Sequence, residues 1–239
     1  MDLGAVKAAS RPELLACVAA AAENARGLLD DAELLSGAGR HARAYSLAVL
    51  AVEEFGKATS LVALAAMPEN LRAQAPVGRM LEWHQLKLVG GMLMAVVKFG
   101  PPGAAATLAA MPVRQLEQVL EETDAFAEDA DRLKLRGLYI DMDRNGRIQR
   151  PSEITETDVS GQLARARQVA SSASVFCDPG VLLADPPAEA IELSRALVHA
   201  FAEAGDVRSP GAAADIVLRA VSDLQQQLAA SHKKARSLS

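Results

Sequence analysis

The chain has 239 residues, of which half are hydrophobic, and 30 acidic against 25 basic residues give it a net charge of -5. Aromatic residues make up only 3%, and the apolar residues are mainly Leu, Val, Ala and Met, so an all-β fold and a largely disordered chain are excluded. The acidic balance excludes a protein that coats nucleic acid with its whole surface.

The first half of the chain predicts four long helices. The first begins at a capping box formed by Ser10 and Glu13, with Pro12 in its first turn, and glycine ends it. A second apolar stripe follows and stops at Pro68. The four helices are expected over residues 10–37, 40–67, 77–98 and 113–135.

The second half predicts a small hairpin and three further helices. Residues 137–150 contain a short apolar run, an Asn-Gly turn and a second short segment, a pattern typical of a β-hairpin. Helices are expected over 155–176, 187–204 and 210–231. We therefore expect an all-α bundle of about six to seven helices with a hairpin insertion. It would form one domain over residues 1–239, with a core at 10–176 and C-terminal helices at 187–231.

The cysteines and the N-terminus bear on the compartment. Cys17 and Cys177 have no CxxC spacing and no neighbouring histidine, so we expect two core thiols in a reducing environment. The N-terminus lacks the basic start and apolar run of a signal peptide, and charged residues interrupt every long apolar stretch. These features predict a cytoplasmic protein without a membrane span.

Two patterns raise the question of a metal. Asp141 to Ile148 matches the first half of an EF-hand loop, but the twelfth position is Ser152 and Pro151 stands where a helix should run, so we expect a β-turn. A di-metal carboxylate bundle needs paired Glu-x-x-His motifs, and the sequence has none. We expect neither a metal nor another cofactor.

Charged residues interrupt the apolar stripe of the second helix, within the segment Glu53-Glu54-Phe-Gly-Lys57. Burying Glu54 and Lys57 is costly unless they are paired, so we expect a buried polar network to which the facing helix contributes His84 and Lys87. This network could support a reaction, or it could only fix the register of the two helices.

Arg79 precedes His84 by five residues. A histidine can remove a proton from a ribose 2′-hydroxyl or protonate the leaving oxygen, and an arginine can stabilise the charge of the phosphorane. On one straight helix, residues five apart do not share a face. The alternative is a histidine that is simply hydrogen-bonded at a helix interface.

Taken in order, four segments resemble the AbiV family of abortive-infection proteins, which is placed near the HEPN helical domains. They are Glu23-Asn24-Ala25 and its surroundings, AVEEFGK at 51–57, WHQLKL at 83–88, and RGLYIDMDRNGRIQRPSEIT at 136–155. The resemblance implies a bacterial protein that acts after phage entry to stop the infected cell from supporting the phage.

Many HEPN proteins are metal-independent ribonucleases that use an Arg-x4-6-His motif completed by two protomers. The matching residues here are Arg79 and His84, and the chain departs from the motif at Met80, where a polar residue is usual. The resemblance thus implies a homodimer that acts on RNA. The supporting polar network is expected to include Asn24, Glu53, Glu54, Lys57 and Lys87.

The alternative function is a non-catalytic interaction module that blocks translation by binding a phage protein or a protein of the translation machinery. The two functions predict different surfaces. A nuclease should gather cations into one groove, whereas an interaction module should expose an apolar patch.

Overall fold

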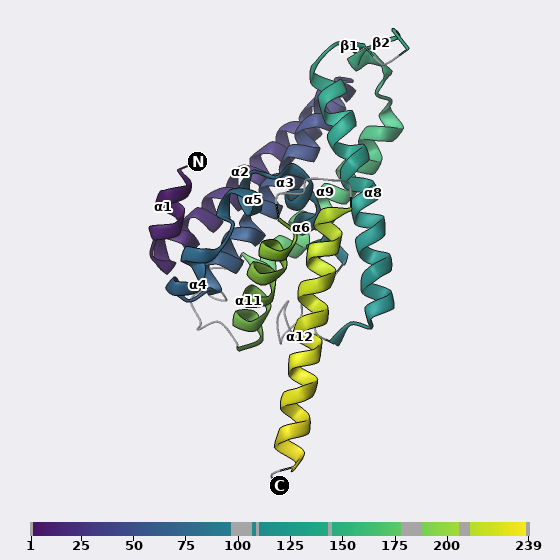
Figure 1. Cartoon of the computed structure of the whole chain (residues 1–239). Coiled ribbons are helices and arrows are strands. Elements are labelled where there is room, and N and C mark those ends of the chain that lie inside the picture. The colour runs from purple at the N-terminus through teal and green to yellow at the C-terminus, as the bar shows by residue number, and fades with distance from the viewer. Residues whose placement is uncertain are drawn as a thin grey trace.

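A computed structural model describes residues 2–96, 107–108, 110–142, 145–177, 188–205 and 211–237. It confirms the all-α fold, because these residues form ten α-helices and one pair of two-residue strands (Figure 1). No helix among them is long and apolar enough to cross a lipid bilayer.

Helix α3 (His41–Ala66) lies at the centre of the molecule and packs against α2 (Arg11–Gly37) along much of its length. The capping box of Ser10 and Glu13 starts α2 as predicted. Many of the buried side chains of this pair are alanines, which allow the two helices to approach closely. Nearly every side of α3 is covered, because α6 (His84–Val96), α8 (Val113–Leu138) and α9 (Glu156–Phe176) also contact it.

The C-terminal helices α11 (Ala188–Glu203) and α12 (Ala212–Ser237) pack against each other, and α12 also lies along α8. The C-terminal end of α12 extends away from the bundle at the opposite extremity from the hairpin (Figure 1). Helix α11 agrees closely with the predicted 187–204, whereas α12 continues six residues beyond the predicted end at 231.

The hairpin is confirmed but is smaller than predicted, because α8 continues to Leu138. Strand β1 (Asp141–Met142) pairs antiparallel with β2 (Ile148–Gln149), and Gly146 takes the positive φ of 77° that the turn requires. A 3-10 turn, η1 (Pro151–Glu153), then leads into α9. Of the calcium-like loop, residues 143 and 144 and the side chain of Asp141 lie outside the described part of the chain.

The predicted helix 77–98 is wrong as a single element. The chain forms α5 (Val77–Glu82), leaves the helical conformation at Trp83, and begins α6 at His84; residues 97–98 lie outside the described part. The Trp83 side chain is buried, and its carbonyl accepts the Lys87 N–H at 3.2 Å, which starts α6. The break allows α5 to pack against α1 (Leu3–Ala8) while α6 follows α3.

Two short helices and one cysteine also differ from prediction. Helices α1 and α4 (Glu69–Gln74) have six residues each, too few for a periodic apolar pattern. The number of helices is therefore higher than the six to seven expected. Cys17 is exposed on α2 and is not a core thiol, whereas Cys177 is buried as predicted.

Gly56 sets the direction of α6 against α3. A methyl group at this position would lie 1.7 Å from the carbonyl oxygen of Lys87, and one at Gly91 would lie 2.7 Å from the carbonyl oxygen of Val52. The two backbones therefore cross at a distance that only glycine permits. This crossing brings the first turn of α6 alongside the middle of α3.

Candidate functional site

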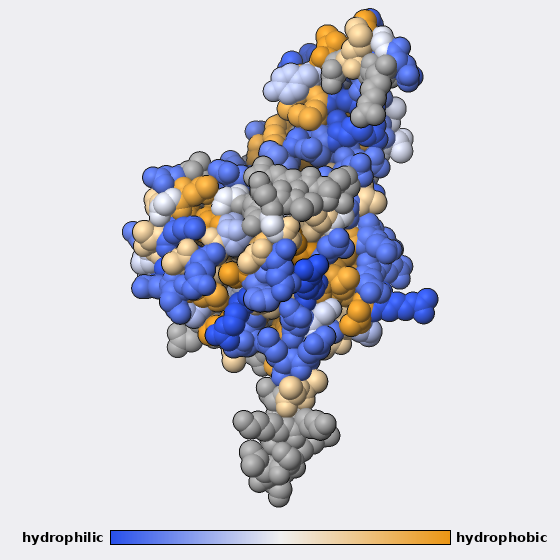
Figure 2. Space-filling view, in the orientation of Figure 1, coloured by the Kyte–Doolittle hydropathy of each residue, from blue (hydrophilic) through white to orange (hydrophobic). Residues whose placement is uncertain are grey.

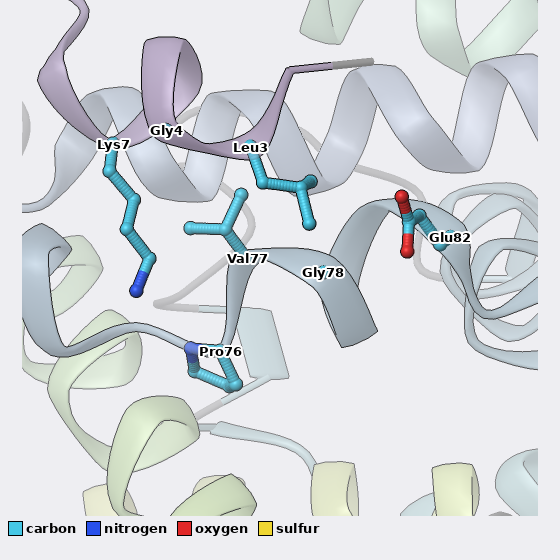
Figure 3. A pocket seen from close by; sticks show the side chains of 7 residues that line it. All are labelled: Leu3, Gly4, Lys7, Pro76, Val77, Gly78 and Glu82. Carbon is cyan, nitrogen blue, oxygen red and sulfur yellow. The ribbon is translucent and has the colours of Figure 1, made fainter.

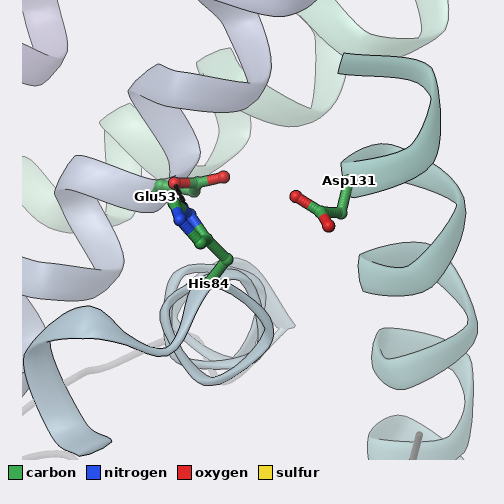
Figure 4. A group of neighbouring side chains, drawn as sticks. All are labelled: Glu53, His84 and Asp131. Carbon is green, nitrogen blue, oxygen red and sulfur yellow. Dashed lines mark hydrogen bonds and ion pairs between the residues drawn. The ribbon is translucent and has the colours of Figure 1, made fainter. Parts of the chain in front are cut away.

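A buried carboxylate, Glu53, is the centre of a polar cluster between α3, α6 and α8. The Nδ1 atom of His84 lies 2.7 Å from Glu53 Oε2, and Lys134 Nζ lies 2.6 Å from Oε1. Lys87 Nζ lies 3.5 Å from Oε2. Figure 4 shows Glu53 and His84 in contact, with Asp131 pointing toward them from α8. We call these five residues the Glu53 cluster.

Local sequence explains this arrangement. Glu53 lies one turn before Gly56, the position at which the α6 backbone meets α3. Because Lys87 is the residue whose carbonyl meets Gly56, its own side chain and that of His84 one turn earlier lie within reach of Glu53. The EEFGK motif therefore supplies both the carboxylate and the close crossing that brings α6 to it.

Electrostatics hold Glu53 in its charged form. Burial by itself raises the pKa of Glu53, but hydrogen bonds to His84 and Lys134 and the charge of Lys134 outweigh burial and lower the pKa below its usual 4.5. Burial also disfavours the charged form of Lys134 and by itself would lower its pKa, but hydrogen bonds to Asp131 and Glu53 outweigh burial and raise the pKa. The carboxylate and the ammonium stabilise each other's charge in the interior.

His84 is the member of the Glu53 cluster that reaches solvent. Its side chain is 55% exposed, while that of Glu53 is 3% exposed. An ionised carboxylate only accepts hydrogen bonds, so Nδ1 of His84 donates to it. In the neutral imidazole the free lone pair is then on Nε2, which can accept and return a proton. The arrangement has the features of a general acid–base group that is oriented by a buried carboxylate.

The same cluster contains three groups of the kind that bind metals. One ligand atom each of Glu53, His84 and Asp131 lies within 4.8 Å of the others. However, Lys134 Nζ lies 2.6 Å from Glu53 and 2.7 Å from Asp131, so an ammonium group already pairs with both carboxylates. A divalent cation would have to displace it, and the three ligands therefore fit a metal poorly.

Only some of the residues predicted for the polar network lie in the Glu53 cluster. Glu53, His84 and Lys87 come together. Glu54 and Lys57 instead form their own ion pair, 3.2 Å apart and partly exposed. Asn24 is exposed on α2, and no hydrogen bond or ion pair links it to the cluster in the described part of the chain.

Arg79 lies on α5, and its side chain is outside the described part of the chain. Its neighbour Met80 is buried, so the position at which the chain departs from the Arg-x4-6-His motif belongs to the core. The break at Trp83 removes the straight-helix geometry that would keep Arg79 and His84 on different faces.

Lys134 and Asp131 were not predicted from the sequence. The buried residues of α8 recur at alternating spacings of three and four, and Lys134 occupies one of these stripe positions. A charged residue on an apolar stripe indicated the polar network of the second helix, and Lys134 is the same kind of signal on α8.

A separate open hollow of about 410 Å³ lies between α1 and α5 (Figure 3). Its lining includes Leu3, Val77 and Pro76, with Lys7 and Glu82 at its edges. Neither His84 nor Glu53 lines it, so it is distinct from the Glu53 cluster.

A family model described as AbiV, of the HEPN type, matches residues 13–171. No curated protein matches the chain. No solved structure matches it either. The matched range includes all five residues of the Glu53 cluster and the hairpin, and ends within α9.

Proposed function

Because this chain belongs to the AbiV family of HEPN-type abortive-infection proteins, we propose that it is an antiphage effector that cleaves RNA without a metal ion. The observation that carries the proposal is the solvent-exposed imidazole of His84, whose Nδ1 is hydrogen-bonded to the buried, ionised Glu53. An imidazole that is oriented in this way by a carboxylate is suited to proton transfer.

In the proposed reaction, His84 Nε2 accepts the proton of a ribose 2′-hydroxyl. The 2′-oxygen bonds to the adjacent phosphorus, the bond from phosphorus to the 5′-oxygen breaks, and that oxygen leaves with a proton. The products are a 2′,3′-cyclic phosphate and a 5′-hydroxyl. Arg79 would stabilise the phosphorane, and in a homodimer the imidazole of a second copy would supply the leaving group's proton.

The other charged residues of the Glu53 cluster have a positioning role in this proposal. Lys87 and Lys134 are only 10% and 6% exposed and face Glu53. Lys134 helps to keep Glu53 ionised, Lys87 adds a second positive charge beside it, and Glu53 in turn holds Nδ1 of His84 and leaves Nε2 free to accept a proton. Loss of either lysine should therefore reduce the cleavage rate without removing a group that touches RNA.

The test is incubation of the purified protein with labelled bulk RNA in EDTA. Wild type should produce fragments with 2′,3′-cyclic phosphate ends, and His84→Ala should reduce the rate by at least about 100-fold. His199→Ala is a matched control, because His199 is also exposed and also lies beside a glutamate, Glu203. Intact RNA after incubation with folded wild-type protein and phage lysate would refute the nuclease proposal.

A specific observation also favours the second candidate, a non-catalytic module that blocks translation by binding a protein. The described lysines nearest His84 face Glu53 and do not form a basic groove, while exposed apolar side chains gather near the hairpin. If infection stops translation while RNA stays intact, and His84→Ala has no effect on this block, the second candidate is supported over the first.

A further inference from the structure

The molecule exposes an unusual number of large apolar side chains at one end. Six of them, each between 45% and 73% exposed, lie within the last turn of α8 and the hairpin. We call them the hairpin surface: Leu135, Leu138, Tyr139, Ile140, Met142 and Ile148. In Figure 2, hydrophobic side chains appear among polar ones at the extremity where Figure 1 places β1 and β2.

The hairpin turns its apolar face toward solvent, the reverse of the usual arrangement in a globular protein. Met142 and Ile148 are register partners across the two strands, so their side chains lie on the same face, and both are exposed. The next residue of β2, Gln149, is the more buried one. A hairpin that only covered a domain would turn its apolar face inward. The exposed apolar face therefore indicates a contact with another molecule.

The area of this surface is suited to a protein contact. With about 200 Å² for a large side chain, the six exposed fractions correspond to about 670 Å², slightly more than the largest apolar patch on a typical monomer. Two such surfaces facing each other would bury at most about 1,300 Å² from these side chains. This is the lower end of the range for stable, specific interfaces.

The composition of the hairpin surface favours a second copy of the chain over RNA. Single-stranded RNA is bound by aromatic platforms and free cations, whereas this surface has one aromatic residue among five aliphatic ones. Residues 136–153 contain four cations and three acids, so this end is nearly neutral on a chain with a net charge of -5. Two copies that meet here would not bring together the acidic excess of the chain.

We propose that the hairpin surface is the interface through which two copies of this chain associate. The inference rests on the homodimer in the proposed function and names the surface that forms it. Lys134 immediately precedes Leu135 on α8, so the same helical turn has one residue in the Glu53 cluster and another on the hairpin surface. Helix α8 thus connects the hairpin surface to the Glu53 cluster.

The test is the solution mass of the full chain by light scattering across a concentration series. Wild type should have the mass of two 25.1 kDa chains. Ile140→Ser with Ile148→Ser should raise the dimer dissociation constant at least about 100-fold, because apolar area is lost on both copies. Leu135→Gln with Leu138→Gln should do the same from the helical side.

Val113→Ser is the control, because Val113 is also an exposed apolar residue but lies at the other end of α8. It should remain a dimer. A wild-type monomer at all concentrations, or both double variants remaining dimers, would overturn the inference. Loss of RNA binding by double variants that remain dimers would also overturn it and assign the surface to RNA. Because this assay measures mass, its failure is separate from failure to cleave RNA.

Discussion

Replacing Glu53 with glutamine should destabilise the protein strongly at neutral pH. The substitution keeps the shape of the side chain but removes the negative charge that faces Lys87 and Lys134, both almost buried. Removing one partner of a buried ion pair costs about 3 to 5 kcal/mol. Lys134 retains Asp131 at 2.7 Å, so the lower end, about 3 kcal/mol, applies. For a chain of this length the thermal midpoint should fall by about 6 to 12 °C.

The pH dependence identifies the cause. The pKa of Glu53 is lower in the folded protein than its usual 4.5, so its contribution is fully present above pH 4.5 and is lost as the pH falls through the folded-state pKa. Urea denaturation of wild type and Glu53→Gln should therefore differ by a constant free energy of unfolding between pH 5 and 8, with a smaller difference in acid.

The neighbouring residue provides a matched control for this experiment. Glu54 is partly exposed and pairs only with Lys57 in the described part of the chain, so Glu54→Gln should cost less than about 1 kcal/mol. Equal losses for Glu53→Gln and Glu54→Gln, or a difference that is unchanged in strong acid, would refute the assignment of Glu53 as the buried centre of the cluster.

Three further predictions concern packing, thiols and metals. Gly56→Ala should lower the free energy of unfolding by at least about 3 kcal/mol, whereas Gly27→Ala, with no atoms near its added methyl group, should raise it by about 0.5 to 1 kcal/mol. Urea denaturation measures both free energies, and similar effects of the two substitutions would contradict the close crossing of α3 and α6. Cys17 is exposed and should react at once with a thiol reagent. Cys177 should react only after unfolding, because burial raises its pKa to about 11. Rapid labelling of both thiols in the native protein would contradict this prediction. Zinc should leave the thermal midpoint unchanged in calorimetry, because the ammonium group of Lys134 already pairs with the carboxylates of Glu53 and Asp131. A rise of the midpoint with zinc would show that a metal displaces this ammonium group.

Except for the helix expected over 77–98, the long helices could be predicted well because each has a clear stripe and a clear start. The position of the buried charge was harder to predict. Glu54 and Lys57 were expected inside because they interrupt a stripe, but α3 is covered on most sides, and the carboxylate that is buried is Glu53. A stripe cannot identify the buried face of a helix that is buried nearly all round. Lys134, on the simple stripe of α8, could have been found by the same reasoning.

The break at Trp83 could not be predicted from local sequence. Val77 to Val96 continues one helical pattern without a glycine pair or a proline at the break. The direction of α6 is set by its crossing at Gly56, which is a tertiary contact more than 25 residues away in sequence. The position of His84 at the start of a helix is therefore a consequence of packing and not of local preference.

The most direct test of the account is the rate of protein synthesis in phage-infected cells that express wild type, His84→Ala or His199→Ala at equal levels. If the Glu53-bound imidazole performs the function, synthesis should fall after infection with wild type and with His199→Ala, and should continue with folded His84→Ala. An equal fall with His84→Ala would contradict the account and would separate the antiphage function from the Glu53 cluster.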